Sequence, residues 1–226
     1  MTPASRPEPV PRIALVTGAS RGLGAALAET LVLRGWQVVA VARTVGGLEE
    51  ADDRARAAGA PGAMTLAPLD ITDDGAMRHL CRSIHDRWGR VDLWAHAAIH
   101  AAPLSPAGHL DPKDWEKSVA INLRATGLLI PLVEPLLRAA PAGTALFLDD
   151  PRGGQPFFGA YGATKAGQIA LARSWQAEAV RVGPRVVIAT PDPMPTATRA
   201  RFFPGEDRAP LADPRDQAAR ILDALG

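Results

Sequence analysis

Two kinds of segment alternate along the chain. Short apolar runs predict strands, and longer stretches with apolar positions three or four residues apart predict helices. Because each crossover is long enough for a helix, the alternation predicts an α/β fold, a doubly wound parallel Rossmann-like sheet of six strands with helices on both faces. The expected strands are 13–16, 37–42, 64–69, 91–98, 144–148 and 185–190, and the expected helices are 25–33, 46–58, 73–88, 112–139, 159–182 and 213–225.

Two segments depart from this alternation. Residues 1–11 contain four prolines and no apolar signal-peptide core, so we expect a loose tail. The proline-rich stretch 191–210 is expected to be a loop that covers the substrate. The remaining chain, 12–226, has the length of one α/β domain.

The composition excludes several classes of partner. Among the 226 residues, 47% are hydrophobic, and the net charge of +1 favours neither nucleic acid nor an anionic membrane. The apolar run 127–137 is broken by Pro131, Glu134 and Pro135, which argues against a membrane span. Cys81 is the only cysteine, so an intramolecular disulfide is impossible, and we expect a cytoplasmic protein.

A glycine-rich turn joins the first expected strand to the first expected helix. It reads Val-Thr-Gly-Ala-Ser-Arg-Gly-Leu-Gly over 16–24. Glycines here permit a tight turn, close approach of a phosphate to the backbone, and tight packing of helix on strand. The alternative is a merely structural turn, but the strands and helix around it favour dinucleotide binding. The expected cofactor-binding residues of the turn are Gly18, Ser20, Arg21, Gly22, Leu23 and Gly24.

The charges near this turn indicate which dinucleotide binds. Arg21 lies in the turn and Arg43 ends the second strand, where a carboxylate would suit a free ribose 2′-hydroxyl. Guanidinium groups suit a 2′-phosphate instead, so we expect NADP(H) in preference to NAD(H), unless both arginines are only solvated surface charges. Asp70, at the end of the third strand, either accepts from the adenine amino group or caps the following turn.

A tyrosine and a lysine form the candidate chemical pair. Tyr161 and Lys165 are four residues apart on one helix, and therefore share a face. A nearby ammonium group lowers the phenol pKa toward the working range of an acid or base. An exposed helix face would explain the spacing of Tyr161 and Lys165 equally well. The helix that carries them follows the fifth strand of a dinucleotide fold, however, and this position favours hydride chemistry.

These motifs resemble the short-chain dehydrogenase/reductase family. The similar stretches are Thr17–Gly24, Leu69–Thr72, Ala120–Leu123 and Tyr161–Lys165, and the similarity extends from about residue 12 to 196. The resemblance implies that Tyr161 is the general acid/base, that Lys165 binds the nicotinamide ribose and tunes Tyr161, and that Asn122 holds a water linking Lys165 to solvent. A buried amide satisfied by helix backbone is the alternative for Asn122. The resemblance also places Ile71, Ala97, Ala98, Pro191 and Thr196 at the cofactor.

The chain departs from the family at the catalytic serine. Asp149 and Asp150 follow the fifth strand there, with Asp150 aligned on the serine and Asp149 a second possibility. A serine donates a hydrogen bond to the substrate oxygen, whereas an ionised aspartate only accepts one. Three alternatives follow: carbonyl reduction that is weak or uses protonated Asp150, an imine-like or pterin-like substrate, or an NADP(H)-binding sensor or subunit with little turnover. Pterin-reducing members of the family carry aspartate here, but they carry arginine where this chain has Gly22.

Two further points concern metals and assembly. His96, His100 and His109 lie close in sequence, but no carboxylate or cysteine spacing supports them, so no metal site is expected. Family members pair through two long helices, here 112–139 and 159–182, and the chain shows no clear seventh strand. We therefore expect a homodimer acting on a small molecule.

Overall fold

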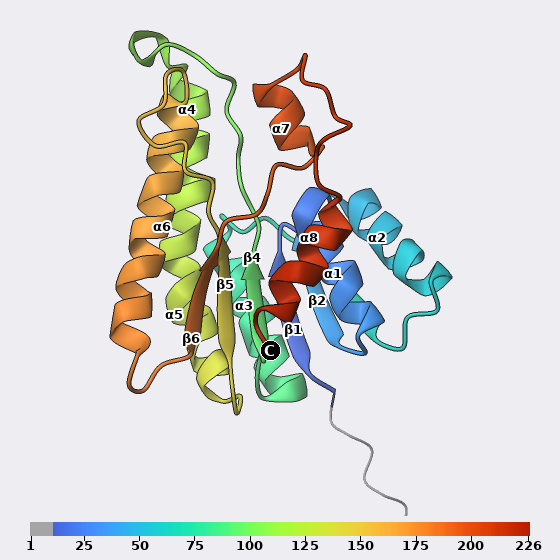
Figure 1. Ribbon diagram of the computed structural model, residues 1–226. Coiled ribbons are helices and arrows are strands. Elements are labelled where there is room, and N and C mark those ends of the chain that lie inside the picture. The colour runs from blue at the N-terminus through green and yellow to red at the C-terminus, as the bar shows by residue number, and fades with distance from the viewer. Residues whose placement is uncertain (1–10) are drawn as a thin grey trace, which may run out of the picture.

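One six-stranded parallel sheet forms the framework of the protein in the computed structural model, which describes residues 11–226 (Figure 1). The strands lie in the order β3-β2-β1-β4-β5-β6, so the direction of winding reverses between β1 and β4. The doubly wound parallel sheet predicted from the sequence is confirmed. The strands are β1 (Ile13–Thr17), β2 (Gln37–Ala42), β3 (Ala63–Pro68), β4 (Leu93–His96), β5 (Thr144–Leu148) and β6 (Arg185–Ala189).

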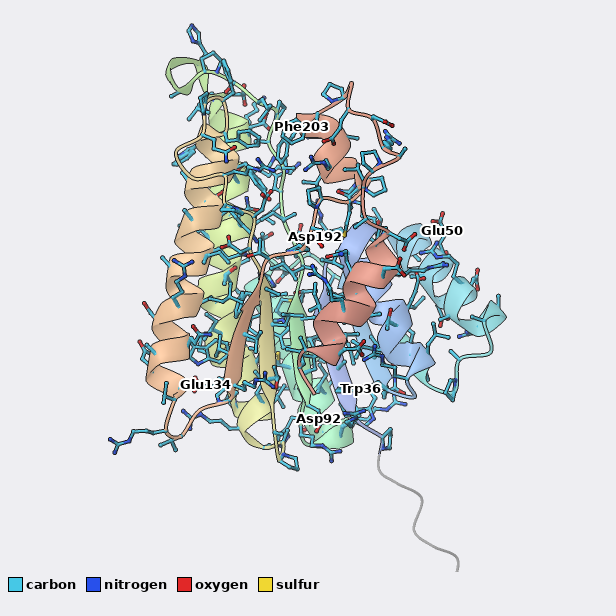
Figure 2. All side chains as sticks on the ribbon, viewed as in Figure 1. Trp36, Glu50, Asp92, Glu134, Asp192 and Phe203 are labelled. Carbon is cyan, nitrogen blue, oxygen red and sulfur yellow. The ribbon has the colours of Figure 1, made fainter. Side chains whose placement is uncertain are left out.

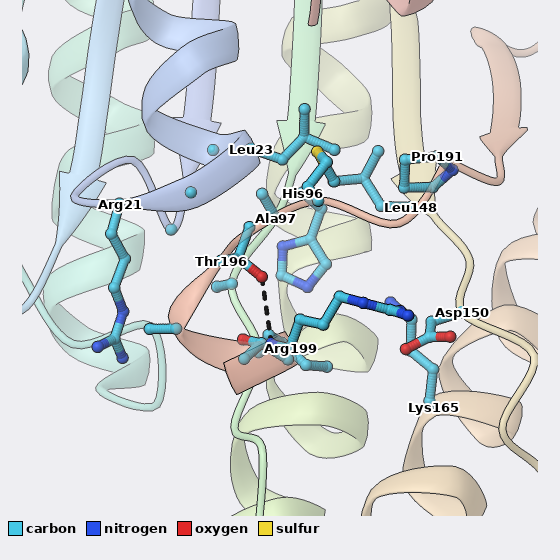
Figure 3. Close-up of a pocket in the computed structure, with 18 of the residues that line it drawn as sticks. Arg21, Leu23, His96, Ala97, Leu148, Asp150, Lys165, Pro191, Thr196 and Arg199 are labelled. Carbon is cyan, nitrogen blue, oxygen red and sulfur yellow. Dashed lines mark hydrogen bonds between the residues drawn. The ribbon is translucent and has the colours of Figure 1, made fainter. Parts of the chain in front are cut away.

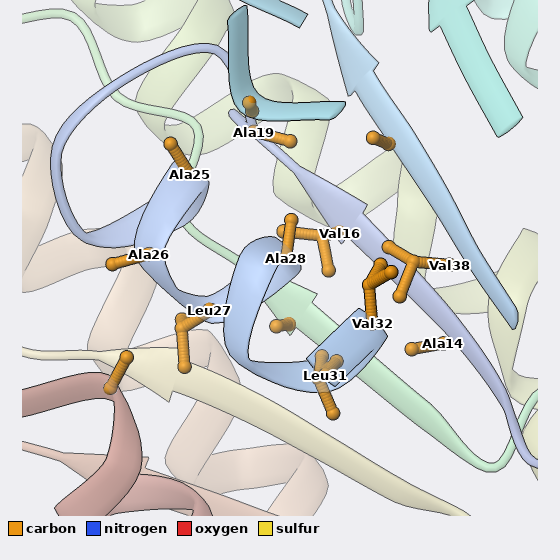
Figure 4. Packing of buried hydrophobic residues seen from close by; sticks show 14 of the residues in the cluster. Ala14, Val16, Ala19, Ala25, Ala26, Leu27, Ala28, Leu31, Val32 and Val38 are labelled. Carbon is orange, nitrogen blue, oxygen red and sulfur yellow. The ribbon is translucent and has the colours of Figure 1, made fainter. Parts of the chain in front are cut away.

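Helices cover both faces of this sheet. Consecutive residues of β1 point to opposite sides: Ala14 packs with one apolar cluster and Leu15 with the other. Figure 4 shows α1 lying on the first side, with Ala28 and Val32 against the strands. The helices α1 (Gly22–Leu33), α2 (Val45–Ala57) and α8 (Pro214–Asp223) cover that face, and α3 (Asp74–Trp88), α5 (Ala125–Arg138) and α6 (Gly159–Ala179) cover the other.

The long helix expected over 112–139 has an irregular middle. It consists of α4 (Pro112–Ser118), a π-helical segment η2 (Val119–Arg124) and α5. By length and composition alone Pro112–Arg138 could cross a membrane, a test that core helices of soluble proteins also pass. Here α5 packs on α3 and β4, and η2 packs on α6. The π turns, which sequence reasoning missed, therefore lie against the helix that carries Tyr161.

The stretch 191–210, expected to be a loop, contains the short helix α7 (Ala197–Phe202). Thr196 caps it, its hydroxyl accepting from the backbone N–H of Arg199 at 3.2 Å. In Figure 1, α7 stands above the carboxyl ends of the strands. Figure 2 shows Phe203 and Asp192 toward that end, and Asp92 and Trp36 at the opposite end.

Other segments lie outside the regular elements. A short 3₁₀ turn, η1 (Ala107–His109), follows β4. Of the tail expected over 1–11, only residue 11 belongs to the described part of the chain. The division into a tail and a single domain over 12–226 stays a prediction.

Candidate active site

A pocket of about 450 Å³ lies at the carboxyl ends of the strands, where the glycine turn, the ends of β2, β4, β5 and β6, and α7 meet (Figure 3). Arg21 lies at one end of the pocket, and Asp150 and Lys165 lie close together at the other end. The structure thus brings together nearly all residues singled out in the sequence, while Asn122 lies behind the wall. Those lining the pocket are Gly18, Ser20, Arg21, Gly22, Leu23, Gly24, Arg43, Asp70, Ile71, Ala97, Ala98, Asp150, Tyr161, Lys165, Pro191 and Thr196.

The glycine turn is too tight for side chains at two positions. Gly18 has a φ of +84°, and a Cβ there would lie 2.5 Å from the backbone nitrogen of Ala98. A Cβ on Gly24 would lie 2.2 Å from the carbonyl oxygen of Gly18. The helix α1 that follows has no side-chain cap and no acidic residue in its first turn. Its N-terminal N–H groups and positive dipole end therefore suit an anion.

Cationic side chains flank this helix end. Arg21 is exposed, and Arg43 is half exposed with its Nη1 4.0 Å from Oδ2 of Asp70. The other oxygen of Asp70 accepts from the backbone N–H and hydroxyl of Thr72, at 2.9 and 2.8 Å. Asp70 therefore caps the turn that follows β3, and its contact with adenine stays a prediction.

At the opposite end, Tyr161 faces a carboxylate. Its hydroxyl donates to Oδ2 of Asp150 at 3.0 Å, and Nε of Arg152 donates to Oδ1 of the same carboxylate at 2.9 Å. The carboxylate of Asp149 lies 4.0 Å from Arg173 on α6. Asp150 is therefore the member of the pair that contacts the tyrosine.

Aromatic rings cover Tyr161. Phe202 of α7 lies 4.8 Å from it and Phe158 lies 6.4 Å away, centroid to centroid, with Phe203 packed beside them. The tyrosine is only 4% exposed. Burial and then the negative charge of Asp150 raise the pKa of Tyr161 well above its ordinary value, because both disfavour the phenolate.

Lys165 is buried one helical turn further along α6. Its ammonium donates to Oε1 of Gln168 at 2.6 Å. Burial lowers the pKa of Lys165 to about 8, against the opposing attraction of Asp149 and Asp150. Sequence reasoning missed Gln168, although a polar residue three positions after Lys165 on a buried face was a usable signal.

Asn122 lies in η2, and its side chain is fully engaged by protein groups. Its Oδ1 accepts from the backbone N–H of His100 at 2.7 Å, and its Nδ2 donates to the His100 carbonyl and to Thr164. These partners come from the loop after β4 and from α6, and not from its own helix. The water predicted at Asn122 stays a prediction, and the carbonyl oxygen of Asn122 accepts from Gln168.

His96 lies in the floor of the pocket, at the end of β4. Its Nδ1 is 2.7 Å from the hydroxyl of Thr17 and its Nε2 is 3.0 Å from that of Thr126. Complete burial lowers the pKa of His96 to about 3, so the ring is neutral at ordinary pH. Over residues 11–226, no group of three His, Cys, Asp or Glu side chains could hold a metal ion.

Comparisons with known proteins find short-chain dehydrogenases that are similar to this chain in sequence and in structure. A family model described as short chain dehydrogenase matches residues 12–207. D-threitol dehydrogenase of Mycolicibacterium smegmatis is 30% identical over 186 residues, which cover 78% of this chain and 70% of that protein. A putative short chain dehydrogenase from Pseudomonas syringae superposes with a TM-score of 0.88 at 29% identity, covering 99% of this chain and 92% of that one. A putative short chain dehydrogenase from Shigella flexneri, complexed with NADP, gives a TM-score of 0.87 at 29% identity, covering 95% and 91%.

Proposed function

Because the chain belongs to the short-chain dehydrogenase/reductase family, we propose that it is an NADP(H)-dependent oxidoreductase with Tyr161 as general acid/base. The observation that carries the proposal is the meeting of the uncapped α1 terminus with Tyr161 and Lys165 in one pocket. Members of the family bind a nicotinamide cofactor. When bound, the cofactor supplies or accepts a hydride at its nicotinamide C4.

The residues of the pocket fit such a cofactor. Gly18 and Gly24 let the turn pack tightly against its own backbone and that of Ala98, and the uncapped N-terminus of α1 that follows offers backbone N–H groups to a pyrophosphate. Arg21 and Arg43 would hold a 2′-phosphate by charge-assisted hydrogen bonds. The NADP complex of the Shigella flexneri protein supports the same preference. Lys165 would donate to the nicotinamide ribose.

Proton transfer falls to Tyr161. Its hydroxyl gives a proton to the substrate during reduction, and its phenolate takes one during oxidation. The Lys165 ammonium stabilises the phenolate that forms, and the Asp150 carboxylate, 3.0 Å from the hydroxyl, opposes it. The net acidity of Tyr161 therefore depends on both charges.

Asp150 also limits the substrate class. An ionised carboxylate accepts hydrogen bonds, so it suits an N–H or cationic nitrogen, as in an imine-like or pterin-like substrate. A carbonyl oxygen fits only beside protonated Asp150, because the anion repels the developing alkoxide. We propose a small carbonyl/alcohol or imine-like substrate.

A second candidate function follows from the same contact. The Tyr161 hydroxyl is engaged by Asp150 within the protein, and Phe202 covers the ring. A protein with this arrangement could bind NADP(H) tightly and turn over little, acting as a sensor or subunit partner.

Turnover assays with purified protein separate the two functions. NADPH consumption is measured against panels of carbonyl compounds and of imines and pterins, together with NADPH affinity. The oxidoreductase proposal expects turnover on one panel, a loss of at least about 10²-fold in Tyr161→Phe, and unchanged NADPH affinity. Tight NADPH binding with no turnover would favour the second function, and no binding would contradict both.

We also propose a homodimer through α4–α5 and α6, without the family's seventh strand. Light scattering that gave a tetramer or monomer would contradict this assembly. A cytoplasmic location stays a prediction.

A further inference from the structure

The amine of Lys165 has a single protein partner. Within residues 11–226, Nζ of Lys165 makes one hydrogen bond, which it donates to Oε1 of Gln168 at 2.6 Å. Lysine and glutamine are both buried, at 6% and 1% exposure. A charged amine in such a place is costly unless an acceptor faces it. The glutamine oxygen therefore matters to the charge of the lysine.

The orientation of the Gln168 amide is fixed by its other end. Its Nε2 donates to the carbonyl oxygen of Asn122 and to the hydroxyl of Thr126, both at 3.0 Å. Thr126 itself donates to the same Asn122 carbonyl. Because both partners of Nε2 accept hydrogen bonds, a flipped amide would place oxygen against oxygen. Oε1 must consequently face Lys165.

The hydrogen-bond network of Gln168 continues through Thr126 to His96 in the floor of the pocket, and these residues add no further charged group. Thr126 lies within hydrogen-bond distance of His96, which in turn contacts Thr17 on β1. His96 is neutral near pH 7 because burial depresses its pKa. The neutral ring has one donor and one acceptor nitrogen, so it donates to one of the hydroxyls of Thr17 and Thr126 and accepts from the other.

Other charged and titratable groups lie on the open side of the amine. Asp149 and Asp150 come from the end of β5, and Tyr161 comes from α6. Each carboxylate has its own arginine, Arg173 or Arg152. Their attraction for the amine is therefore partly offset, whereas Gln168 contacts it directly.

We propose that Gln168 is a positioning residue that holds the Lys165 amine in place and keeps it protonated. Its consequence for catalysis rests on the proposed function, because a neutral Lys165 would no longer stabilise the Tyr161 phenolate. The positioning role itself can be measured without cofactor or substrate.

The sequence makes a direct measurement simple. The chain has three lysines, and Lys113 and Lys117 are exposed. Protein labelled with carbon-13 at lysine Cε gives three NMR signals whose pH titrations report each pKa separately. Lys165→Met assigns the buried signal, and the exposed lysines serve as internal references.

Two variants of Gln168 move the titration in opposite directions. Gln168→Met removes the acceptor, and should lower the pKa of Lys165 by about one to two, the equivalent of one hydrogen bond to a charged group. Gln168→Glu places a charged acceptor at the amine and should raise its pKa, at a cost in stability because its second oxygen replaces the donor to the Asn122 carbonyl. The matched control is Gln176→Met on the same helix, whose amide donates to the Val186 carbonyl, and it should leave Lys165 unchanged.

The outcomes separate this inference from the proposed function. Unchanged Lys165 titration in both Gln168 variants, or an equal change in Gln176→Met, would overturn the positioning role even in an active enzyme. The expected shifts in a protein that never binds NADP(H) would uphold it and contradict the proposed function. Circular dichroism at each pH confirms that the variants are folded, and Gln168→Glu keeps the test decisive if Gln168→Met does not fold.

Discussion

Removing the charge of Asp150 should make Tyr161 a stronger acid. The Tyr161 hydroxyl and Asp150 Oδ2 are 3.0 Å apart, and at an effective dielectric constant of ~20 a full charge pair at that distance interacts by about 5.5 kcal/mol. Two features reduce this figure. Arg152 neutralises the other carboxylate oxygen at 2.9 Å, and the Asp150 side chain is 32% exposed to screening water.

The remaining effect is that of one hydrogen bond to a charged group, about 1.5–3 kcal/mol. Since 1.36 kcal/mol corresponds to one pKa unit, Asp150→Asn should lower the pKa of Tyr161 by about 1–2. Because asparagine keeps a neutral acceptor for the hydroxyl, the expected shift lies at the lower end of this range, about 1. Asp150→Ser should lower the pKa similarly and raise carbonyl reduction by about 10²-fold, because a donor replaces the anion.

Tyr161 is the only tyrosine in the chain, so the ultraviolet absorbance of phenolate reports this residue alone. The titration is run on the wild type and both variants, with circular dichroism to mark alkaline unfolding. Tyr161→Phe must abolish the signal. An unchanged or higher pKa in Asp150→Asn would refute the electrostatic reasoning, and the proposed competition between Asp150 and Lys165 with it.

Three further predictions concern the cofactor, the fold and acid stability. Arg43→Asp should weaken NADPH binding by about 10–100-fold and NADH binding little, as titration calorimetry can measure, whereas Arg87→Asp, away from the pocket, should change neither. Gly24→Ala should cost about 1–3 kcal/mol in urea unfolding, because its Cβ would lie 2.2 Å from a carbonyl oxygen of the turn, while Gly46→Ala, with open space around it, should not destabilise. Burial lowers the pKa of His96 to about 3 in the folded protein, against about 6.5 in the unfolded chain. Between pH about 3 and about 6.5 the unfolded state therefore binds more protons than the folded state. Stability should therefore fall as pH drops through that window, by up to about 1.4 kcal/mol per pH unit, and His96→Gln should flatten the slope in urea unfolding; an unchanged slope would contradict the assignment.

The sequence predicted the framework of the fold because local signals and tertiary packing agree there. The six apolar runs predicted as strands all form strands of the sheet, and β5 begins and ends at the expected residues. The glycine turn was recognisable because Gly18 has a positive φ and Gly24 packs against the Gly18 carbonyl, two requirements that arise within the turn itself. The spacing of Tyr161 and Lys165 follows from helix geometry alone.

The features that could not be predicted from the sequence depend on contacts between distant segments. The π turns of η2 have no sequence signature, and α7 forms among prolines that flank it without entering it. Phe202 reaches Tyr161 only because α7 stands over the strand ends. Gln168 gains its importance from an amide orientation set by Asn122 and Thr126 on another helix.

The central claim is that one pocket binds NADP(H) and presents its nicotinamide to Tyr161. A crystal structure of the protein with NADPH tests it most directly. The account predicts the 2′-phosphate beside Arg21 and Arg43, the pyrophosphate over the glycine turn, and the nicotinamide beside Tyr161 and Lys165. A nicotinamide bound away from Tyr161, or a protein that binds no pyridine nucleotide, would contradict it.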